Sequence, residues 1–186
     1  MKRILVVAVL FIFLTGCKSD DTSLQRPMKV RENLLKSKSC SFLATITADY
    51  TDKFYSFQLS CRTDSDGSLH FEVVTPDTIK GISGVMNALG GKLTFDDVIL
   101  AFPSLADGQL SPVSAPWIFM NTLRSGFIES CGNDGEKLQV NIDDSYEENP
   151  IHLTIWLDRT DTPIRAEILY KGKRILSMDV KDFIIQ

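Results

Sequence analysis

An alternation of apolar and polar side chains runs through most of the chain from Ser39 onward, and it constrains the fold more than any other feature. Apolar residues occupy every second position from residue 40 to residue 50, and the pattern returns in residues 55–61 and 151–158. A period of two is that of a β-strand with one buried and one solvated face. Short turns rich in Asp, Gly and Pro separate the alternating segments. The sequence therefore predicts an α+β, mostly antiparallel β fold, with a curled, open half-barrel of about ten to eleven strands.

Two segments replace this alternation with helical patterns. Residues 24–36 predict an N-terminal helix that holds Pro27 near its first turn. Its expected apolar side consists of Leu24, Met28, Leu34 and Leu35. A second helix is predicted to open at Ser114 as its N-cap and to end before Gly126 as its C′ residue. Apolar side chains surround most of that helix, so we expect it to be buried or to lie over a cavity.

The first sixteen residues predict an export signal. Two basic residues precede an unbroken apolar run, Ile4–Leu14, which is too short to cross a membrane because a spanning helix needs about 20 residues. The run ends in Leu14-Thr15-Gly16-Cys17, which resembles the bacterial lipobox, where the signal is cut before the cysteine and the thiol carries a diacylglycerol. We therefore expect an acylated Cys17, a tether over residues 17–23, and one domain over residues 24–186 at the extracytoplasmic face of the membrane.

Charge limits the partners of this domain. The chain has 20 Lys and Arg against 24 Asp and Glu, and its formal net charge is -4. Cleavage after residue 16 removes Lys2 and Arg3, which makes the domain more acidic by two charges. An acidic surface is repelled by anionic headgroups, so we expect the domain to stand off the bilayer. The absence of a basic surplus argues against a nucleic-acid partner.

The remaining cysteines suggest one pair and one residue left over. A four-residue loop at residues 49–52 sets Cys40 opposite Cys61 across the first hairpin, at a separation that a disulfide can close. An exported protein meets an oxidising compartment, so we predict a Cys40–Cys61 disulfide, with two buried free thiols as the alternative. Three alternatives stay open for Cys131: a buried free thiol, a disulfide-linked homodimer, or swapped pairing with Cys40 or Cys61.

Catalytic signatures are missing from the sequence, which has no G-x-S-x-G, H-E-x-x-H or C-x-x-C motif. His70 and His152 fall on separate predicted strands, and we interpret both as solvent-face residues. The spacing of Cys and His indicates no zinc site, and no cofactor is expected. An acidic segment is expected to be a solvated turn, with weak calcium binding or a basic partner as alternatives; it contains Asp143, Asp144, Glu147 and Glu148. The sequence favours a binding protein over an enzyme.

The apolar helix and the sheet allow two interpretations. The helix residues expected over the concave face of the sheet are Trp117, Phe119, Met120 and Leu123. The inward-facing row of the strands consists of Phe42, Ile46, Phe57, Leu59, Phe71 and Val73. Together these side chains form either the packed core of a small domain or the lining of an apolar cavity, closed by the helix, that accepts acyl chains.

The order of elements is one helix, three long strands, short irregular strands, an apolar helix and five long strands. Over Ser39–Gln186 this order resembles the LolA/LolB-like superfamily of lipoprotein carriers and receptors. The similar stretches are Phe71–Pro76 before Ile79–Gly81, Ile155–Asp158 before Pro163–Glu167, and the closing segment Val180–Ile185. The resemblance implies an open barrel closed by a helical lid, and it assigns no ligand-binding residue to a position in this chain.

The lipobox makes the chain similar to the membrane-anchored members of that superfamily, including the LolA-like germination lipoproteins of spore-forming bacteria. Members of that subgroup are associated with cell-wall amidase partners. The resemblance therefore implies a scaffold for a protein partner such as a cell-wall hydrolase. The alternative is a carrier or receptor that binds acyl chains or lipoproteins in the half-barrel. A permanent anchor suits a scaffold better than a shuttle, so the partner-binding interpretation is preferred.

Overall fold

The computed structural model describes residues 21–49, 54–95, 98–102, 105–106, 109–146, 148 and 150–186. The predicted export signal, Cys17 and the first residues of the predicted tether lie outside the described residues. Within them, no helix has the length and apolar character that crossing a membrane requires.

Eleven antiparallel strands of the described chain form one sheet in the order β6-β5-β4-β3-β2-β1-β13-β12-β11-β10-β9. The first half contains β1 (Ser39–Asp49), β2 (Phe54–Asp64), β3 (Leu69–Thr75), β4 (Ser83–Asn87), β5 (Gly90–Phe95) and β6 (Val98–Phe102). The second half contains β9 (Phe127–Asp134), β10 (Lys137–Asp143), β11 (Ile151–Leu157), β12 (Pro163–Tyr170) and β13 (Lys173–Ile185). β1 and β13 pair in the middle, so two meanders join there. Over the residues that the structure describes, the sheet does not close into a barrel, and β6 and β9 are its two edges.

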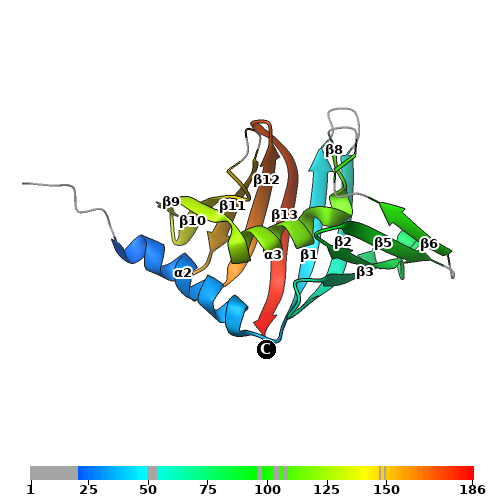
Figure 1. The fold of residues 1–186 in the computed structure, drawn as a ribbon, viewed down its shortest axis with the longest axis horizontal. Coiled ribbons are helices and arrows are strands. Elements are labelled where there is room, and N and C mark those ends of the chain that lie inside the picture. The colour runs from blue at the N-terminus through cyan, green and yellow to red at the C-terminus, as the bar shows by residue number, and fades with distance from the viewer. Residues whose placement is uncertain are drawn as a thin grey trace, which may run out of the picture.

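Helices cover part of this sheet. α3 (Ala115–Ser125) lies across one face and contacts β10, β12 and β13, while α2 (Asp21–Lys36) contacts α3 and β9 (Figure 1). Two short 3-10 turns, η1 (Asp77–Ile79) and η2 (Pro112–Ser114), and a two-stranded ribbon of β7 (Leu105–Ala106) and β8 (Gln109–Leu110) complete the described elements. The predicted antiparallel sheet with two helices is confirmed in this described part of the chain.

The alternation of the strands matches their burial. In β1 every second side chain is buried, and Ala44, Ile46 and Ala48 have no exposed surface. The rings of Phe42, Phe119 and Phe183 meet with centroids 5.8–6.3 Å apart. These rings join β1, α3 and β13, so the centre of the core lies where the two meanders meet.

Two turns explain how consecutive strands keep their apolar sides together. Gly67 has a φ of +86°, as a bulged three-residue turn between β2 and β3 requires. The register beyond this turn sets Cys61 opposite Phe71, so the apolar sides of β2 and β3 stay together. Between β12 and β13, Lys171 and Gly172 have φ values of 51° and 72°, typical of a two-residue hairpin turn.

The predicted register of the first hairpin is wrong by two residues. β1 and β2 pair as far as Asp49 opposite Phe54, so Asp49 belongs to the strand and not to the predicted loop at residues 49–52. Cys61 therefore faces Phe42, Cys40 faces Thr63, and both thiols are free and buried. A shift of two residues leaves every side chain on its own face, so the apolar pattern cannot distinguish the two registers. The predicted Cys40–Cys61 disulfide is not present.

The N-terminal helix begins three residues earlier than predicted. Pro27 therefore lies in the interior of α2 rather than in its first turn. Of the four residues expected on the apolar side only Leu34 is buried, while Val30 is buried in their place. The exposed members are Leu24, Met28 and Leu35. The packed side of α2 is thus rotated relative to the predicted one.

The predicted caps of the second helix occupy their expected places but act differently. Ser114 makes no capping bond, because it is part of η2 and its Oγ donates to the carbonyl of Ser111 at 2.6 Å. Gly126 has a φ of -69°, outside the left-handed region, and its N–H donates to the Thr122 carbonyl. A Cβ on Gly126 would lie 2.6 Å from the carbonyl oxygen of Asp143, so glycine is required there for space.

Candidate functional site

The edge strand β6 is the most unusual surface of the described chain. Val98, Ile99 and Leu100 are 57%, 66% and 60% exposed, and Phe95 at the end of β5 is 49% exposed. Among the described residues β6 pairs with β5 alone, so its other side presents backbone N–H and C=O groups. We call these four residues and the free side of β6 the β6 edge. An apolar strand with an open backbone side can accept another strand.

The position of the hairpin explains this exposure. Strands β5 and β6 extend past the end of α3, so the helix that buries the middle of the sheet does not reach them (Figure 1). Inside the hairpin the packing is tight, because a Cβ on Gly91 would overlap the side chains of Met86 and Phe102. The inner side of the hairpin is thus anchored in the core, while its edge faces solvent.

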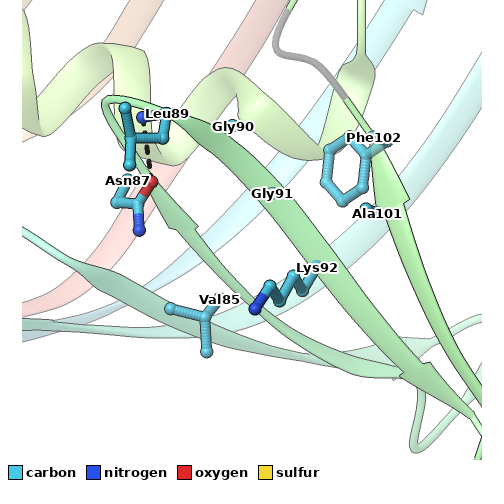
Figure 2. Close-up of a pocket in the computed structure, with 8 residues that line it drawn as sticks. All are labelled: Val85, Asn87, Leu89, Gly90, Gly91, Lys92, Ala101 and Phe102. Carbon is cyan, nitrogen blue, oxygen red and sulfur yellow. Dashed lines mark hydrogen bonds between the residues drawn. The ribbon is translucent and has the colours of Figure 1, made fainter.

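A pocket of about 630 Å³ lies beside the β6 edge (Figure 2). Its lining residues are Val85, Asn87, Leu89, Gly90, Gly91, Lys92, Ala101 and Phe102. The polar side chains among them are Asn87, whose Oδ1 accepts the N–H of Leu89 at 2.9 Å, and Lys92. Ligand sites have volumes of roughly 300–1,000 Å³ and mostly apolar walls, so the pocket has the size and chemistry of a small amphipathic ligand site.

The predicted lid and inward-facing row lie together in the core. Phe119, Met120 and Leu123 are buried, and Trp117 is half-buried. In the row beneath them Phe42, Ile46, Leu59, Phe71 and Val73 are buried and Phe57 is half-buried. The helix and the sheet are thus in direct contact. Both interpretations place the helix over this row of the sheet, so the lid stays a prediction.

The opposite edge of the sheet is covered. Arg31 of α2 donates from Nε to the Leu123 carbonyl at 2.8 Å and from Nη2 to the Gly126 carbonyl at 2.7 Å. These bonds satisfy carbonyls at the C-terminal end of α3 and hold α2 beside β9. Burial lowers the pKa of Arg31, whose guanidinium nevertheless remains charged at neutral pH.

Three thiols are present in the described chain, and none has the character of a reactive thiolate. Burial raises the pKa of Cys40 to about 12, and burial together with the neighbouring Cys40 raises the pKa of Cys61. Cys131 lies half-buried on β9, and burial raises its pKa as well. Nucleophilic thiols require a lowered pKa, so the geometry gives no support to cysteine chemistry. The Cys131-linked homodimer stays a prediction.

The two histidines lie on separate strands and on the solvated side, as predicted. His70 of β3 contacts Asp64 Oδ2 through Nε2 at 3.0 Å. His152 of β11 contacts Asp143 Oδ1 through Nδ1. The sequence did not indicate the second pair, because the register of β10 and β11 cannot be derived across the long segment that connects them.

The acidic turn divides into parts with different environments. Asp143 ends β10, and Asp144 accepts the backbone N–H of Ile151 at 2.8 Å, which closes the turn. Glu148 is exposed, and Glu147 lies outside the described residues. The turn is therefore partly built into the sheet rather than wholly solvated.

Sequence reasoning also missed the β6 edge. Val98–Phe102 is an uninterrupted apolar run, which is typical of a strand buried on both faces, yet the structure places it at an edge. Its neighbours Asp96 and Asp97 were the available signal, since charged residues beside a short apolar run favour a solvent-exposed hairpin.

No protein-family model matches the chain, and no curated protein matches it. Solved structures with a similar fold include a LolA superfamily protein from Nitrosomonas europaea, with 8% identity and a TM-score of 0.46 over 88% of this chain and 93% of that one. The lipoprotein LppX from Mycobacterium tuberculosis has 10% identity and a TM-score of 0.44 over 89% of this chain and 96% of that one. A chain of the MucA/MucB complex of Pseudomonas aeruginosa has 15% identity and a TM-score of 0.39 over 88% of this chain and 57% of that one. At TM-scores below 0.5, no argument about function rests on these likenesses.

Proposed function

We propose that this chain is a lipid-anchored, non-enzymatic protein of the extracytoplasmic face that binds a protein partner along the β6 edge. The observation that carries the proposal is the exposure of Val98, Ile99 and Leu100 on a strand whose outer backbone groups have no strand partner in the described chain. Natural sheets usually protect such an edge with charges, proline or a covering element. An unprotected edge of this kind is what strand addition requires.

The position of the expected anchor supports a protein partner over a membrane surface. Three residues separate Cys17 from Asp21 at the start of α2, and the four residue steps between them span at most about 14 Å when extended. The start of α2 and the β6 edge lie at opposite ends of the molecule (Figure 1). An anchor at Cys17 therefore leaves the β6 edge directed away from the bilayer and accessible to another envelope protein.

The chemistry of the surface defines the partner segment. An added strand would satisfy the open backbone groups of β6 and would place alternate apolar side chains against Val98, Ile99 and Leu100. The partner therefore offers an extended segment that is apolar on both faces. A cell-wall hydrolase is the partner class implied by the resemblance to germination lipoproteins, and it stays a prediction.

Site-specific crosslinking tests this proposal. A photo-crosslinking amino acid is placed at Ile99 in the full chain, with Asn133 on the exposed part of β9 as the matched control position. We expect a discrete crosslinked product from Ile99 in native envelopes and none from Asn133. Crosslinking only to lipid, or equal products from both positions, would contradict partner binding at β6.

A second candidate function is the binding of an anionic acyl ligand, as in the carrier or receptor alternative. The pocket of about 630 Å³ beside Gly91 favours it, because its walls are mostly apolar and Lys92 supplies a cation for a carboxylate or phosphate headgroup. Native mass spectrometry of the full chain in detergent with an added fatty acid would test it. Binding that is lost in Lys92→Glu and kept in Ile99→Lys would assign the acyl ligand to this pocket.

A further inference from the structure

Three potential metal ligands meet on the solvated face of neighbouring strands at the covered edge of the sheet. Glu129 comes from β9, Asp143 from β10 and His152 from β11. One donor atom from each lies within 4.8 Å of the other two. Asp143 and His152 face each other directly in the β10–β11 register, and their side chains are in contact. The sheet thus assembles two carboxylates and an imidazole from segments that are separate in the sequence.

A β-bulge brings the third ligand to this face. The pairing of β9 with β10 passes from Ser130 opposite Asn141 to Ile128 opposite Ile142, so Glu129 is an extra residue without a partner in the register. In a regular strand Glu129 would point to the opposite face from Ser130. The bulge instead directs its carboxylate to the side of Asp143 and His152, as the short separation of their donor atoms requires.

We propose that Glu129, Asp143 and His152 bind a divalent transition-metal ion, for which Zn²⁺ is the best fit. An imidazole nitrogen and two carboxylate oxygens are ligands that Zn²⁺ accepts, and water or a partner group completes four-fold coordination. The two carboxylates balance the charge of the ion. Ca²⁺ suits this set less well, because it binds about 6–8 oxygen atoms, whereas this set contains a nitrogen ligand and only two carboxylates.

Metal binding requires the three donor atoms to move slightly closer together. At zinc–ligand distances of about 2.0–2.2 Å, tetrahedral donors lie roughly 3.4 Å apart. Asp143 and His152 are already in contact, so the movement falls mainly on Glu129, which is exposed. Rotation of its flexible side chain can bring the carboxylate closer without moving the strands.

His70 also pairs with an aspartate, but in the described chain it lacks a second carboxylate of the kind that Glu129 supplies beside His152. That aspartate is Asp64, and the group nearby is Arg62, whose Nε lies 3.7 Å from the same carboxylate. A guanidinium balances that carboxylate and repels a cation. His70 is therefore the matched control for His152.

Calorimetric titration of the full chain in detergent with ZnCl₂ tests the site. We expect saturable binding to a single site in the wild type. In His152→Ala and Glu129→Gln the affinity should fall by at least about tenfold, as expected for removal of a ligand, whereas His70→Ala should bind like the wild type. Far-UV circular dichroism of each variant checks that the fold is retained, and Glu129→Gln alters only an exposed side chain.

Cobalt absorption gives a second readout that a purely structural role would not affect. We expect d–d bands from Co²⁺ with the wild type and with His70→Ala, and their loss in His152→Ala. Absence of Zn²⁺ binding in the wild type would overturn the proposal. So would equal affinity in the wild type and in both ligand variants, or tighter binding of Ca²⁺ than of Zn²⁺.

Discussion

The two edges of the sheet are built in opposite ways. At β9 the chain uses three protective devices, namely charged residues such as Glu129 and Asp134, a bulge, and the covering helix α2. At β6 the strand Val98–Phe102 carries no charge, and its first four residues are exposed. Both edges expose the same kind of backbone groups, and these devices are what natural sheets use to prevent unwanted pairing. The β9 edge is therefore protected against pairing with another strand, whereas these devices are absent from the described residues of β6.

A second contrast concerns stability. The middle of the sheet is held by Phe42, Phe119 and Phe183, whereas the β6 edge adds little burial of its own. Substitutions in the middle should therefore lower the free energy of unfolding strongly. Substitutions at the β6 edge should change that free energy little and should mainly weaken partner binding. The following experiments separate these effects, from the largest to the smallest.

Phe119→Ala should cause the largest loss of stability. The side chain is fully buried between α3 and the sheet, where its ring contacts Phe42 and Phe183, and truncation of such a residue costs about 3–5 kcal/mol of unfolding free energy. Phe95→Ala at the β6 edge is the matched control, with an expected loss of about 1 kcal/mol or less. Urea unfolding of the full chain measures both. Similar losses in the two variants would contradict the division between a stabilising centre and a binding edge.

Arg31→Ala should weaken the covered edge specifically. Its guanidinium satisfies the carbonyls of Leu123 and Gly126, and the loss of hydrogen bonds from a charged group costs about 1.5–3 kcal/mol. Lys29→Ala, on the exposed part of α2, should change stability by about 0.5 kcal/mol or less. Hydrogen exchange should show faster exchange in β9 of the Arg31 variant. Unchanged exchange in β9 would mean that α2 does not protect that edge.

Ile99→Lys should affect association and leave stability nearly constant. The residue is 66% exposed, so the change in unfolding free energy should be about 0.5 kcal/mol or less. A charge on an edge strand opposes strand addition, so capture of the crosslinked partner should fall by about tenfold. Asn133→Lys places the same charge on β9 and should have no effect on capture. Equal effects of the two lysines would remove the distinction between the edges.

At neutral pH the thiols should give the smallest effect, because their contribution appears only as a dependence of stability on alkaline pH. The pKa of Cys40 is raised to about 12, whereas an unfolded thiol has a pKa of about 8.5. Between these values the unfolded chain loses a proton that the folded chain keeps, so stability should fall as the pH rises through this window. Cys40→Ala should reduce the slope, as measured by urea unfolding at successive pH values. A stability that is constant across the window would contradict the burial of this thiol.

The strands could be predicted because each one follows its own local pattern. The predicted segment 151–158 differs from β11 by a single residue at its end. The alternation fixes which face each side chain takes, and Gly67 and Gly172 mark turns whose backbone requires a positive φ. These features are encoded within a few residues.

The errors arose where the answer depends on segments far apart in the chain. The pairing of Cys40 could not be determined because a shift of two residues preserves the apolar pattern. The buried side of α2 depends on α3 and β9, which follow about ninety residues later. The proximity of Glu129 to His152 depends on a bulge and on the register between β10 and β11, neither of which the sequence marks. The β6 edge is different, because Asp96 and Asp97 beside it were a local signal.

Cysteine accessibility at the two edges tests the central claim most directly. Ile99→Cys and Asn133→Cys would be introduced separately, and alkylation by a membrane-impermeant maleimide would be followed by peptide mass spectrometry in the purified full chain and in intact envelopes. We predict that the cysteine at position 99 reacts rapidly in the purified chain and slowly in envelopes, while the cysteine at position 133 reacts at the same rate in both. Equal rates at position 99 in the two preparations would contradict a partner docked on the β6 edge.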